Sequence, residues 1–518
     1  MKRKANSVKN SAFRKNLAIL WSFSKICDIM TSFEQEIKKK GESVMYELFS
    51  KLIENISNVM YSYLLIIMLL AVGLYFTFRT KFVQFRLLGE SIRLVGEKKE
   101  GDKSSVSAFQ ALMVSTASRV GTGNIVGVAN AIAIGGYGAV FWMWIIALVG
   151  GASAFIESTL AQIYKKRDKD GGSYGGPAYY IEAALKKRWL GVLFAVALVA
   201  TYAVGFNMLC SYNMVTSLSG YSFYGDPETS VVPLICGAVL AILSAVCLLG
   251  GGKRIVKVTG VLVPVMGVTY ILMALVAMLM NIGNVPMVFR EIFAGAFDFK
   301  AIFGGFAGSA LMQGIKRGLY SNEAGVGSAP NAAAAADVSH PAKQGLVQML
   351  SVFIDTLLIC TATTMMCLCS GIVPSENLTG ALFVQQALAI DFGFFGYIFI
   401  TGALVLFAFT TLLGNLYYCE GCLNYIAKRQ LSKKTMRIFY LIACVVIFGG
   451  ALLDFGMVWN VADVLMGVMA IINLPVIVML GKPALATLKD YVDQRKAGKN
   501  PAFKANTVGL QGQLDFWN

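Results

Sequence analysis

The sequence predicts an all-α polytopic membrane protein with about eleven transmembrane helices, arranged as two inverted repeats of five helices after one extra helix. Three observations support this fold class. Of 518 residues, 56% are hydrophobic and 14% are charged, whereas roughly 25% of residues in soluble domains are charged. Apolar stretches close to the roughly 20 residues that span a bilayer recur along the chain. Two of these stretches, five segments apart, are interrupted by glycines, at residues 121–123 and 304–309.

The predicted transmembrane segments follow the apolar stretches in chain order. They cover residues 60–78, 109–134, 139–164, 189–217, 232–250, 255–281, 300–318, 344–370, 394–424, 436–453 and 457–481. We expect residues 1–44 to be a basic leader outside the fold, because their one apolar run is too short to span a bilayer. The rest divides into an extra helix with its cytoplasmic loop, a first five-helix repeat, an inverted second repeat and a cytoplasmic tail, at 45–106, 107–281, 282–482 and 483–518.

Charged residues alternate between the loops. Basic clusters follow the first, third, fifth and ninth segments, and loops 218–231, 371–393 and 454–458 contain no Lys or Arg. By the positive-inside rule, the odd-numbered segments end in the cytoplasm. This predicts a cytoplasmic C-terminus, and an outside N-terminus if the chain starts near Met45. The basic residues behind the net charge of +16 lie in these loops and in residues 1–44 and not on one soluble face, so we infer no nucleic-acid partner.

The order of the two interruptions predicts the symmetry of the fold. Because they are five segments apart and five is odd, the second segment enters from the cytoplasm and the seventh from outside, which is an inverted-topology repeat. Unwound chain within a membrane is tolerated where it lines protein or a water-filled cavity. The interruptions therefore predict a binding site.

The first interruption has groups for both a cation and an anion. The carbonyls of Ala117 and Val120 can turn toward a cation, and the N–H groups of Thr122, Gly123 and Asn124 begin a half-helix whose positive end suits a carboxylate. The alternative is that the small residues at 123 and 127 only form a close helix contact.

Thr410 and Thr411 form a pair of neighbouring hydroxyls in the ninth segment. Such hydroxyls often bond back to their own helix. Facing Ala117 and Val120, with the carbonyl of Phe407 one turn earlier, they would complete an all-oxygen site for a hard monovalent cation. Both interpretations remain open at this level.

Charged residues within or near the spans are candidates for function, and their ordinary role is mutual pairing between helices. They are Arg119, Glu157, Asp355, Glu420 and Asp463. The cysteines are expected to be packing residues. For the Cys419 and Cys422 pair we also favour packing over redox or metal chemistry, because no second pair accompanies it.

Four motifs in the same order resemble those of the alanine or glycine:cation symporter family, which are amino-acid transporters of the leucine-transporter fold. They lie at residues 119–125, 135–144, 175–182 and 322–330. The resemblance runs from about Tyr46 to Lys482. It implies sodium-coupled symport of a small neutral amino acid into the cell by alternating access, with no enzymatic activity and no obligate protein partner.

The resemblance also implies the binding residues. Sodium would bind between the first broken helix and the ninth segment, at Ala117, Val120, Phe407, Thr410 and Thr411. The substrate carboxylate would bind at Thr122 and Gly123, beside Asn124, and the amino group at the second interruption. The residues expected there are Gly308, Ser309, Ala310 and Gln313. A loop helix at 377–390 would be the external gate.

Two positions depart from the family pattern. Asn415 stands where the family commonly has tryptophan, one turn after Thr411, and Cys210 lies where a Gln-x-Asn motif is usual. Both belong to the expected substrate pocket. Replacing an indole by a small amide adds space and polarity, so we expect a larger or polar substrate such as glutamine, serine or asparagine. Lys257, near one end of the sixth segment, keeps a proton-coupled alternative open.

No phosphate-binding loop of an ATP-driven pump is present in the sequence. A channel would also use backbone carbonyls, but it gives no reason for two interruptions in inverted repeats.

Overall fold

The computed structural model describes residues 42–97, 106–168, 172–226, 229–297, 309–375, 377–453, 455–510 and 514–517. The chain divides into two compact units, Met1–Asn58 and Val59–Asn518. In the first unit the described residues form most of α2 (Glu42–Val59). The second unit holds the other elements, and the description below concerns this unit by itself.

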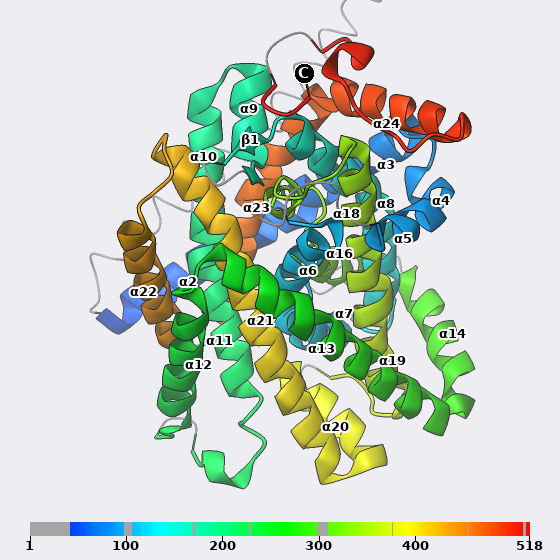
Figure 1. Cartoon of the computed structure of the whole chain (residues 1–518). Coiled ribbons are helices and arrows are strands. Elements are labelled where there is room, and N and C mark those ends of the chain that lie inside the picture. Colours follow the sequence, from blue (N-terminus) through cyan, green and yellow to red (C-terminus); the bar gives the residue numbers. More distant parts are fainter. Residues whose placement is uncertain are drawn as a thin grey trace, which may run out of the picture. The chain divides into compact units, whose positions relative to one another are not determined.

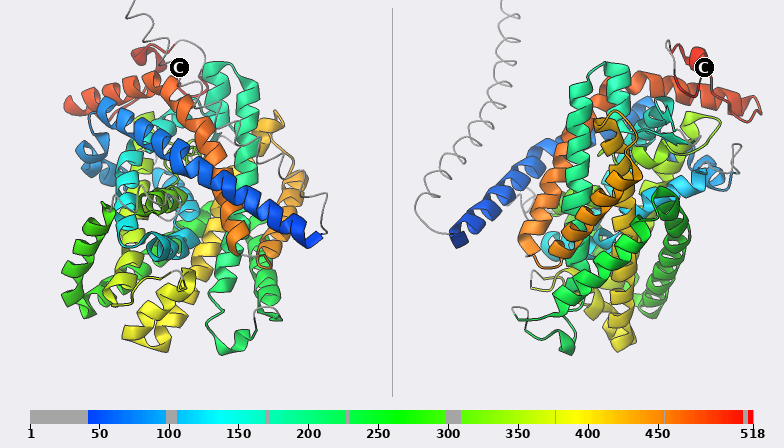
Figure 2. Two further views of the ribbon diagram at one scale, coloured as in Figure 1. Left: turned by 180° about the vertical axis from the view of Figure 1, so that it is seen from behind. Right: turned by 60° about the vertical axis from the view of Figure 1, so that its left-hand side comes forward.

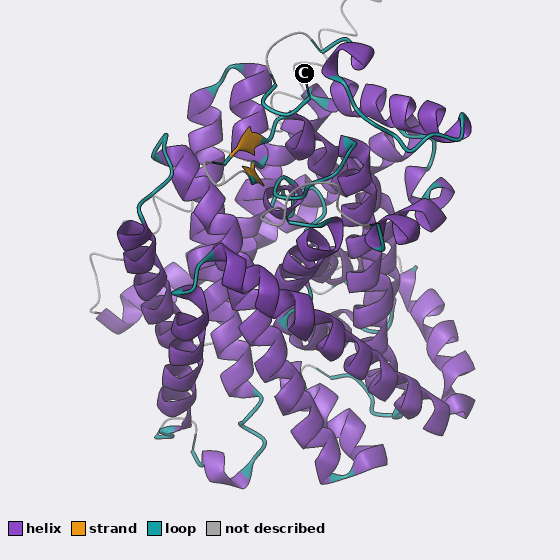
Figure 3. Ribbon diagram, in the orientation of Figure 1, coloured by secondary structure: helices purple, strands orange, loops and turns teal. Residues whose placement is uncertain are grey.

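The second unit is helical almost throughout (Figures 1 and 3). Its helices before the second repeat are η1 (Met60–Leu64), α3 (Leu65–Arg79), α4 (Val83–Arg86), α5 (Leu88–Val95), α6 (Ala108–Arg119), η2 (Gly123–Gly127), α7 (Val128–Gly135), α8 (Gly138–Ile163), α9 (Pro177–Leu185), α10 (Arg188–Val199), η3 (Ala200–Gly205), α11 (Phe206–Thr216), η4 (Ser222–Tyr224), α12 (Val232–Leu248), α13 (Gly252–Met280), η5 (Ile282–Asn284) and α14 (Val285–Ala296).

The later helices begin at residue 310. They are α16 (Ala310–Asn322), α17 (Pro330–Ala333), α18 (Pro341–Phe353), η7 (Ile354–Cys360), α19 (Thr361–Cys369), α20 (Gly380–Phe392), α21 (Phe394–Ile426), α22 (Lys433–Gly450), α23 (Phe455–Met479), α24 (Gly481–Lys496) and η8 (Ala505–Val508). Two short strands, β1 (Lys166–Arg167) and β2 (Ser173–Tyr174), pair antiparallel with Lys166 opposite Tyr174.

Seven helices of the described residues are long and apolar enough to cross a membrane. They cover Glu47–Arg79, Gly138–Ile163, Arg188–Thr216, Gly252–Met280, Pro341–Cys369, Phe394–Ile426 and Gly456–Met479. Shorter apolar helices cover Gly123–Gly135, Val232–Leu248 and Gly380–Phe392. The predicted helical membrane protein is confirmed. The sequence predicts about eleven transmembrane segments, and the structure has fewer long apolar helices. Part of this difference arises because an interrupted segment contributes two short halves instead of one long helix.

Helices at equal positions of the two repeats pack on each other. α8 packs along α18, α11 along α21, and α12 along α22. Each repeat begins with an interrupted segment, α6 followed by α7 in the first and α16 followed by α17 in the second. Buried apolar side chains from both repeats form one continuous core, and three π-helical turns, η2, η3 and η7, lie within its helices.

The second unit has two ends that differ in charge. α24, the β1 and β2 strands and the turn between α9 and α10 lie at one end, which we call the α24 end, and α20 and η4 lie at the other (Figures 1 and 2). The basic loop segments Lys165–Arg167 and Lys186–Arg188 belong to the α24 end. This grouping is the one that the alternation of charge in the sequence predicts.

Candidate functional site

The first interruption lies where the sequence predicts it. α6 ends at Arg119, and Val120 leaves helical geometry with φ −75° and ψ 84°. The helix resumes at Gly123. The N–H of Gly121 donates to the side-chain oxygen of Asn124 at 2.8 Å, and the N–H of Asn124 donates to the carbonyl of Gly121 at 3.2 Å. Asn124 therefore fastens the unwound residues with its own backbone and side chain.

One predicted cation ligand from each repeat meets the other at this interruption. The hydroxyl of Thr411 on α21 donates to the carbonyl oxygen of Ala117 at 3.0 Å, and a Cβ added to Gly121 would collide with the same hydroxyl. Ala117, Val120, Phe407, Thr410 and Thr411 are all buried. The end of α6 and the middle of α21 thus place polar oxygens together away from solvent.

The two threonines do not behave alike. Thr410 donates to the carbonyls of its own helix, Leu406 at 3.0 Å and Phe407 at 3.2 Å. This is the ordinary arrangement for a helical threonine. Thr411 instead reaches across to α6, so the structure distinguishes two hydroxyls that the sequence leaves equivalent.

The second interruption is displaced from its predicted position. Residues 304–308, including Gly308, lie outside the described residues. Ser309 is the N-cap of α16, with its hydroxyl accepting from the N–H of Met312, and the helix then runs unbroken to Asn322. The unwound stretch follows Asn322, where Glu323 has φ 54°, Gly325 φ 84° and Gly327 φ 90°. Glycine adopts such positive φ values without the steric cost that side chains impose.

Two of the expected substrate residues lie at the start of α16. Ala310 and Gln313 lie in the first turn of α16, and the Cβ of Gln313 faces Gly135 at the far end of α7. They are therefore three turns from Gly123 and do not approach the first interruption. Sequence reasoning did not single out residues 322–329, because this polar stretch lowers the apparent hydrophobicity of the segment to which it belongs.

The last turn of α16 is the part that reaches the first interruption. The ring of Tyr320 covers Gly123 so closely that an added Cβ would collide with it. The hydroxyl of Ser118 donates to the carboxylate of Glu323 at 3.4 Å, and Ser328 donates to the same carboxylate at 2.6 Å. The two interrupted segments are thus in contact at their unwound residues.

Asn124 is the centre of a buried polar cluster. Its side-chain nitrogen donates to Asp355 at 2.7 Å and to the hydroxyl of Ser321 at 2.9 Å. Asp355 also accepts from Ser321 at 2.5 Å and from Thr356 at 3.0 Å. One carboxylate on the π-helical turn η7 therefore connects both interrupted segments. Sequence reasoning treated Asp355 only as one of five charged candidates, and its spacing gave no sign of this partner.

Thr122 contacts α11. Its hydroxyl accepts from the side-chain nitrogen of Asn213 at 3.0 Å and lies 3.9 Å from the sulfur of Cys210. Cys210 is therefore beside the first interruption, as expected. Asn213 was missed, although it stands three residues after Cys210 and so shares its helix face.

Asn415 faces the same way as Thr411, as its spacing of four residues predicts. Its side-chain oxygen accepts from Ser118 at 2.8 Å, and its nitrogen donates to Asn207 at 3.0 Å. The residue is fully buried. Asn415 therefore connects α21 with both α6 and α11, next to the first interruption.

The other charged candidates hold helices together. Asp463 on α23 pairs with Lys316 at 2.9 Å and Arg317 at 3.3 Å. Glu157 accepts from the N–H of Gly325 at 3.3 Å and from Asn473 at 2.8 Å, so it fixes the second interruption. The remaining two contact polar atoms of neighbouring helices, Arg119 with the carbonyl of Gln348 and Glu420 with the hydroxyl of Tyr440.

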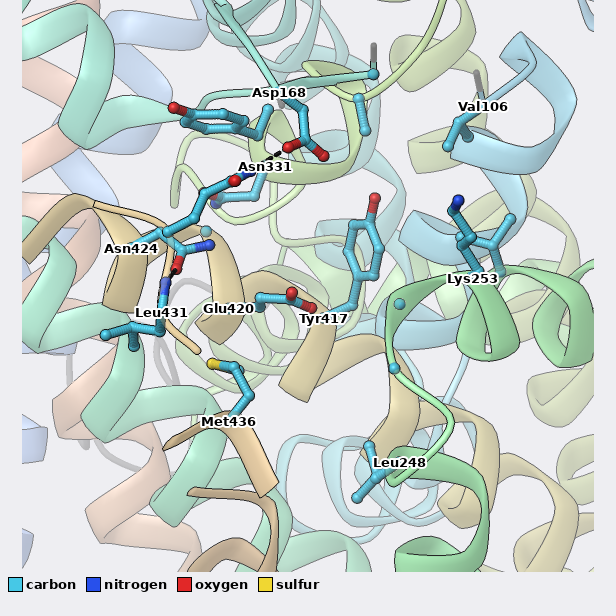
Figure 4. A pocket seen from close by; sticks show the side chains of 18 of the residues that line it. Val106, Asp168, Leu248, Lys253, Asn331, Tyr417, Glu420, Asn424, Leu431 and Met436 are labelled. Carbon is cyan, nitrogen blue, oxygen red and sulfur yellow. Dashed lines mark hydrogen bonds between the residues drawn. The ribbon is translucent and has the colours of Figure 1, made fainter. Parts of the chain in front are cut away.

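A cavity of about 780 Å³ opens at the α24 end. Segments far apart in the sequence line it, and Figure 4 shows Asp168, Lys253, Asn331, Tyr417 and Glu420 among the side chains around it. Tyr417 stands two residues after Asn415 on α21. The cavity is thus lined by the part of α21 that follows Asn415.

Two sequence candidates for other chemistry gain no support. Among the described residues no group of three or more His, Cys, Asp or Glu side chains is placed to hold a metal ion. Cys419 and Cys422 are free and buried. Lys257 is exposed on α13, and so it does not contribute to the buried polar groups described above.

Comparisons with known proteins agree with this geometry. The model of the sodium:alanine symporter family matches residues 45–505. The amino-acid carrier protein AlsT of Bacillus subtilis is 45% identical over 473 residues, covering 91% of this chain and 98% of the relative. The probable sodium/glutamine symporter GlnT of the same organism is 42% identical over 474 residues, covering 91% and 97%.

A third relative and a solved structure extend the comparison. The sodium/alanine symporter AgcS of Methanococcus maripaludis is 39% identical over 456 residues, covering 86% of this chain and 98% of the relative. The crystal structure of MhsT in complex with L-phenylalanine has a TM-score of 0.55 at 16% identity, covering 76% of this chain and 93% of that chain. At this identity the likeness shows the fold alone, which is that of the leucine transporter.

Proposed function

The chain belongs to the sodium:alanine symporter family, and we propose that it couples sodium bound at the meeting of α6 and α21 to the uptake of a neutral, preferentially polar amino acid. The protein is a multi-pass membrane transporter for sodium-coupled amino-acid symport, and it is not an enzyme. The binding positions, the substrate and the orientation are inferred below.

The contact between Thr411 and Ala117 is the observation that carries the sodium site. It joins a hydroxyl of the second repeat to a carbonyl at the end of a half-helix of the first repeat. A hard monovalent cation requires several oxygen ligands at close range. With Val120, Phe407 and Thr410, these residues supply carbonyl and hydroxyl oxygens from both sides of the gap. A bound sodium ion would replace the hydrogen bond as the link between α6 and α21.

The substrate carboxylate binds at the start of the half-helix that follows the first interruption. The N–H groups of Thr122 and Gly123 lie at the positive end of η2 and α7, which favours an anion. Gly123 is covered by Tyr320, so the carboxylate binds in a shielded position. Asn124 holds this backbone through Gly121 and Asp355, and so we assign it a positioning role in place of direct contact.

The substrate amino group binds at the C-terminal end of α16 in this proposal, because Gln313 lies at the other end of that helix. The last carbonyls of a helix carry partial negative charge, and α16 ends at Asn322 beside the first interruption. Ser321 contacts Asn124 there. An amino acid would then have its two charged groups between the opposite ends of two half-helices, which is the arrangement expected of transporters with inverted repeats.

The substrate side chain lies near Cys210 and Asn415. Each polar atom of an asparagine amide can form more than one hydrogen bond, so Asn415 can bind a substrate while it holds Ser118 and Asn207. Polar surroundings favour glutamine, serine or asparagine at least as well as alanine. The names of the relatives include both glutamine and alanine, which agrees with a family whose pocket varies.

The α24 end faces the cytoplasm in this proposal. The basic loop residues gather there, and such clusters remain on the cytoplasmic side. The C-terminus is then cytoplasmic, and the N-terminus is outside if the chain starts near Met45. The cavity lined by Tyr417 and Glu420 becomes the path between the binding site and the cytoplasm.

Uptake of labelled amino acids into proteoliposomes tests the proposal. An inward sodium gradient should drive accumulation of glutamine, serine and alanine, and replacing sodium with choline should abolish it. A proton gradient without sodium should drive nothing. The proton gradient is tested because of one further relative. The sodium/proton-dependent alanine carrier protein of Bacillus sp. PS3 is 38% identical to this chain. Accumulation driven by a proton gradient alone would mean that protons, and not sodium, are the coupling ion. Uptake restricted to alanine and glycine would refute the pocket assignment.

A further inference from the structure

Residues 514–517 fold back onto the α24 end of the second unit, and we call them the tail tip (Leu514–Trp517). The indole N–H of Trp517 donates to the carbonyl of Gln162 in the last turn of α8, at 2.8 Å. The carbonyl of Trp517 accepts from the N–H of Ala505 at 2.8 Å, and its ring packs edge-on against Phe503. The tip lies beyond residues 45–505, so the family resemblance assigns it no role.

Basic residues of β1 hold the tip through its charge and its aromatic face. Asp515 pairs with the amine of Lys166 at 3.0 Å and accepts from the backbone N–H of Arg167 at 3.3 Å. The guanidinium of Arg167 lies over the ring of Phe516, 4.5 Å from its centre. The amine of Lys165 lies 4.6 Å from the centre of the same ring and 5.0 Å from that of Trp517. Each of these cation–π contacts adds to the attraction that holds the tip in place.

The residues under the tip are the ones that hold α17. Lys165 donates to the carbonyl of Ala336 at 3.0 Å. Gln162 donates to the carbonyls of Ala333 and Ala336, at 2.5 Å and 2.8 Å. α17 is the short helix directly after the second interruption, and its residue Asn331 lines the cavity. The tip therefore covers the two side chains that fix this half-segment to α8.

We propose that the tail tip is a latch on α17, which restrains the movement of this helix beside the open cavity and thereby limits the rate of transport. A hydrogen bond shielded from water is stronger than an exposed one. With the tip docked, Gln162 holds the last carbonyl of α17, at Ala333, and Lys165 and Gln162 hold the carbonyl of Ala336 in the turn that follows, both in a shielded position. With the tip released, water competes for both donors, and α17 is held less firmly. The strand that the tip contacts continues directly into Asp168, a residue of the cavity wall, and Ala335 of the same wall lies beside the carbonyl of Ala336 that Lys165 and Gln162 hold.

The inference rests on transport activity alone and not on the assigned ligand positions. Its test compares the full chain with Trp517→Ala and with a variant that lacks residues 514–518. Asn506→Ala is the matched control, because Asn506 is exposed and belongs to the same segment but not to the tip. Initial uptake rates are measured in proteoliposomes at equal protein content, as functions of substrate and of sodium concentration.

Both tip variants should raise the maximal uptake rate two- to fivefold and leave the sodium concentration for half-maximal uptake unchanged. Labelling of Cys422 by a thiol reagent, followed by mass spectrometry, should also become at least threefold faster, because Cys422 is buried against Asn331 of α17. The control should match the full chain in both assays. Unchanged rates and unchanged labelling in folded tip variants would overturn the latch, as would a lower maximal rate with normal membrane insertion.

Discussion

The hydroxyl of Thr411 and the carbonyl oxygen of Ala117 are 3.0 Å apart, and this hydrogen bond joins the second repeat to the first at the interrupted helix. Thr410, its neighbour, bonds within its own helix. We therefore predict that Thr411, which already spans the gap, contributes more than Thr410 to the proposed cation site.

Thr411→Ala should therefore raise the sodium concentration for half-maximal uptake by roughly tenfold or more, because it removes a ligand worth about 1–3 kcal/mol in a buried site. Thr410→Ala should raise it less. Substrate affinity at saturating sodium should change little in either. Thr411→Ser keeps the hydroxyl and serves as the control. A normal sodium activation curve for Thr411→Ala would remove Thr411 from the cation site.

Gly123→Ala should abolish most uptake. The added Cβ would collide with the ring of Tyr320, and overpacking of this kind costs about 1–3 kcal/mol. The displaced ring or backbone would disturb the proposed carboxylate site. Gly402→Ala is the matched control, since it places the same methyl group in α21 with no atom within 4 Å. We expect at least a tenfold loss for the first and no loss for the second, in proteins of similar thermal stability. Equal uptake by the two variants would contradict this placement.

Asp355→Asn should lower transport, and a second substitution should restore part of it. The carboxylate accepts from Asn124, Ser321 and Thr356, and an amide in its place turns a donor toward donors. Each buried group left unpaired costs about 1–3 kcal/mol.

Combining Asp355→Asn with Asn124→Asp exchanges donor and acceptor and allows their hydrogen bond to form again, while the oxygen at position 124 still accepts from Gly121. The double variant should exceed both single variants in uptake rate at equal expression. If it is slower than both, the two residues act independently and do not position the interruption together.

Asn415→Trp should shift selectivity toward alanine and glycine. The indole fills the space near Cys210 and cannot reproduce the hydrogen bonds to Ser118 and Asn207. Larger substrates should be excluded most, because a site that hydrogen-bonds a substrate group strongly discriminates against analogues that do not fit it. Competition of unlabelled glutamine, serine and alanine against labelled alanine measures the change. An unaltered ranking would mean that residue 415 does not line the pocket.

His340 makes the stability of the protein sensitive to acid. It caps α18, with Nδ1 accepting from the N–H of Ala342 at 3.1 Å, and so its Nε2–H faces Asp490 at 3.1 Å. Burial is the main cause that lowers its pKa from 6.5 to about 4, against the opposing effect of Asp490. Between about pH 6.5 and 4 the unfolded chain binds a proton that the folded chain does not, so stability falls as pH decreases through this window, by an amount on the order of 3 kcal/mol at its lower end.

Thermal unfolding of the purified protein between pH 7 and 4.5 measures this effect. Other groups also titrate there, so the informative quantity is the difference from His340→Asn, which can cap the helix and donate to Asp490 without titrating. The variant should lose less stability than the natural sequence on acidification. Parallel curves for the two proteins would show that His340 does not contribute.

The sequence by itself determined the class of the protein, the first interruption and the family. Apolar length, glycine at 121 and 123, and the alternation of basic loops are local properties, and physical chemistry in a bilayer leaves few structures compatible with them. The expectation that Asn415 shares a face with Thr411 also followed from helical spacing alone.

The tertiary structure decided which side chains meet across segments. Local glycine content favoured residues 304–309 for the second interruption, yet the chain unwinds after Asn322, where Glu157 and Ser118 supply partners for the freed polar groups. Asp355 and Asn124 are also far apart in the sequence, by 231 residues, and are joined by a hydrogen bond. Trp517 likewise contacts Gln162 in the last turn of α8. Such contacts depend on how helices pack, and no spacing within one segment encodes them, because each partner belongs to a different helix.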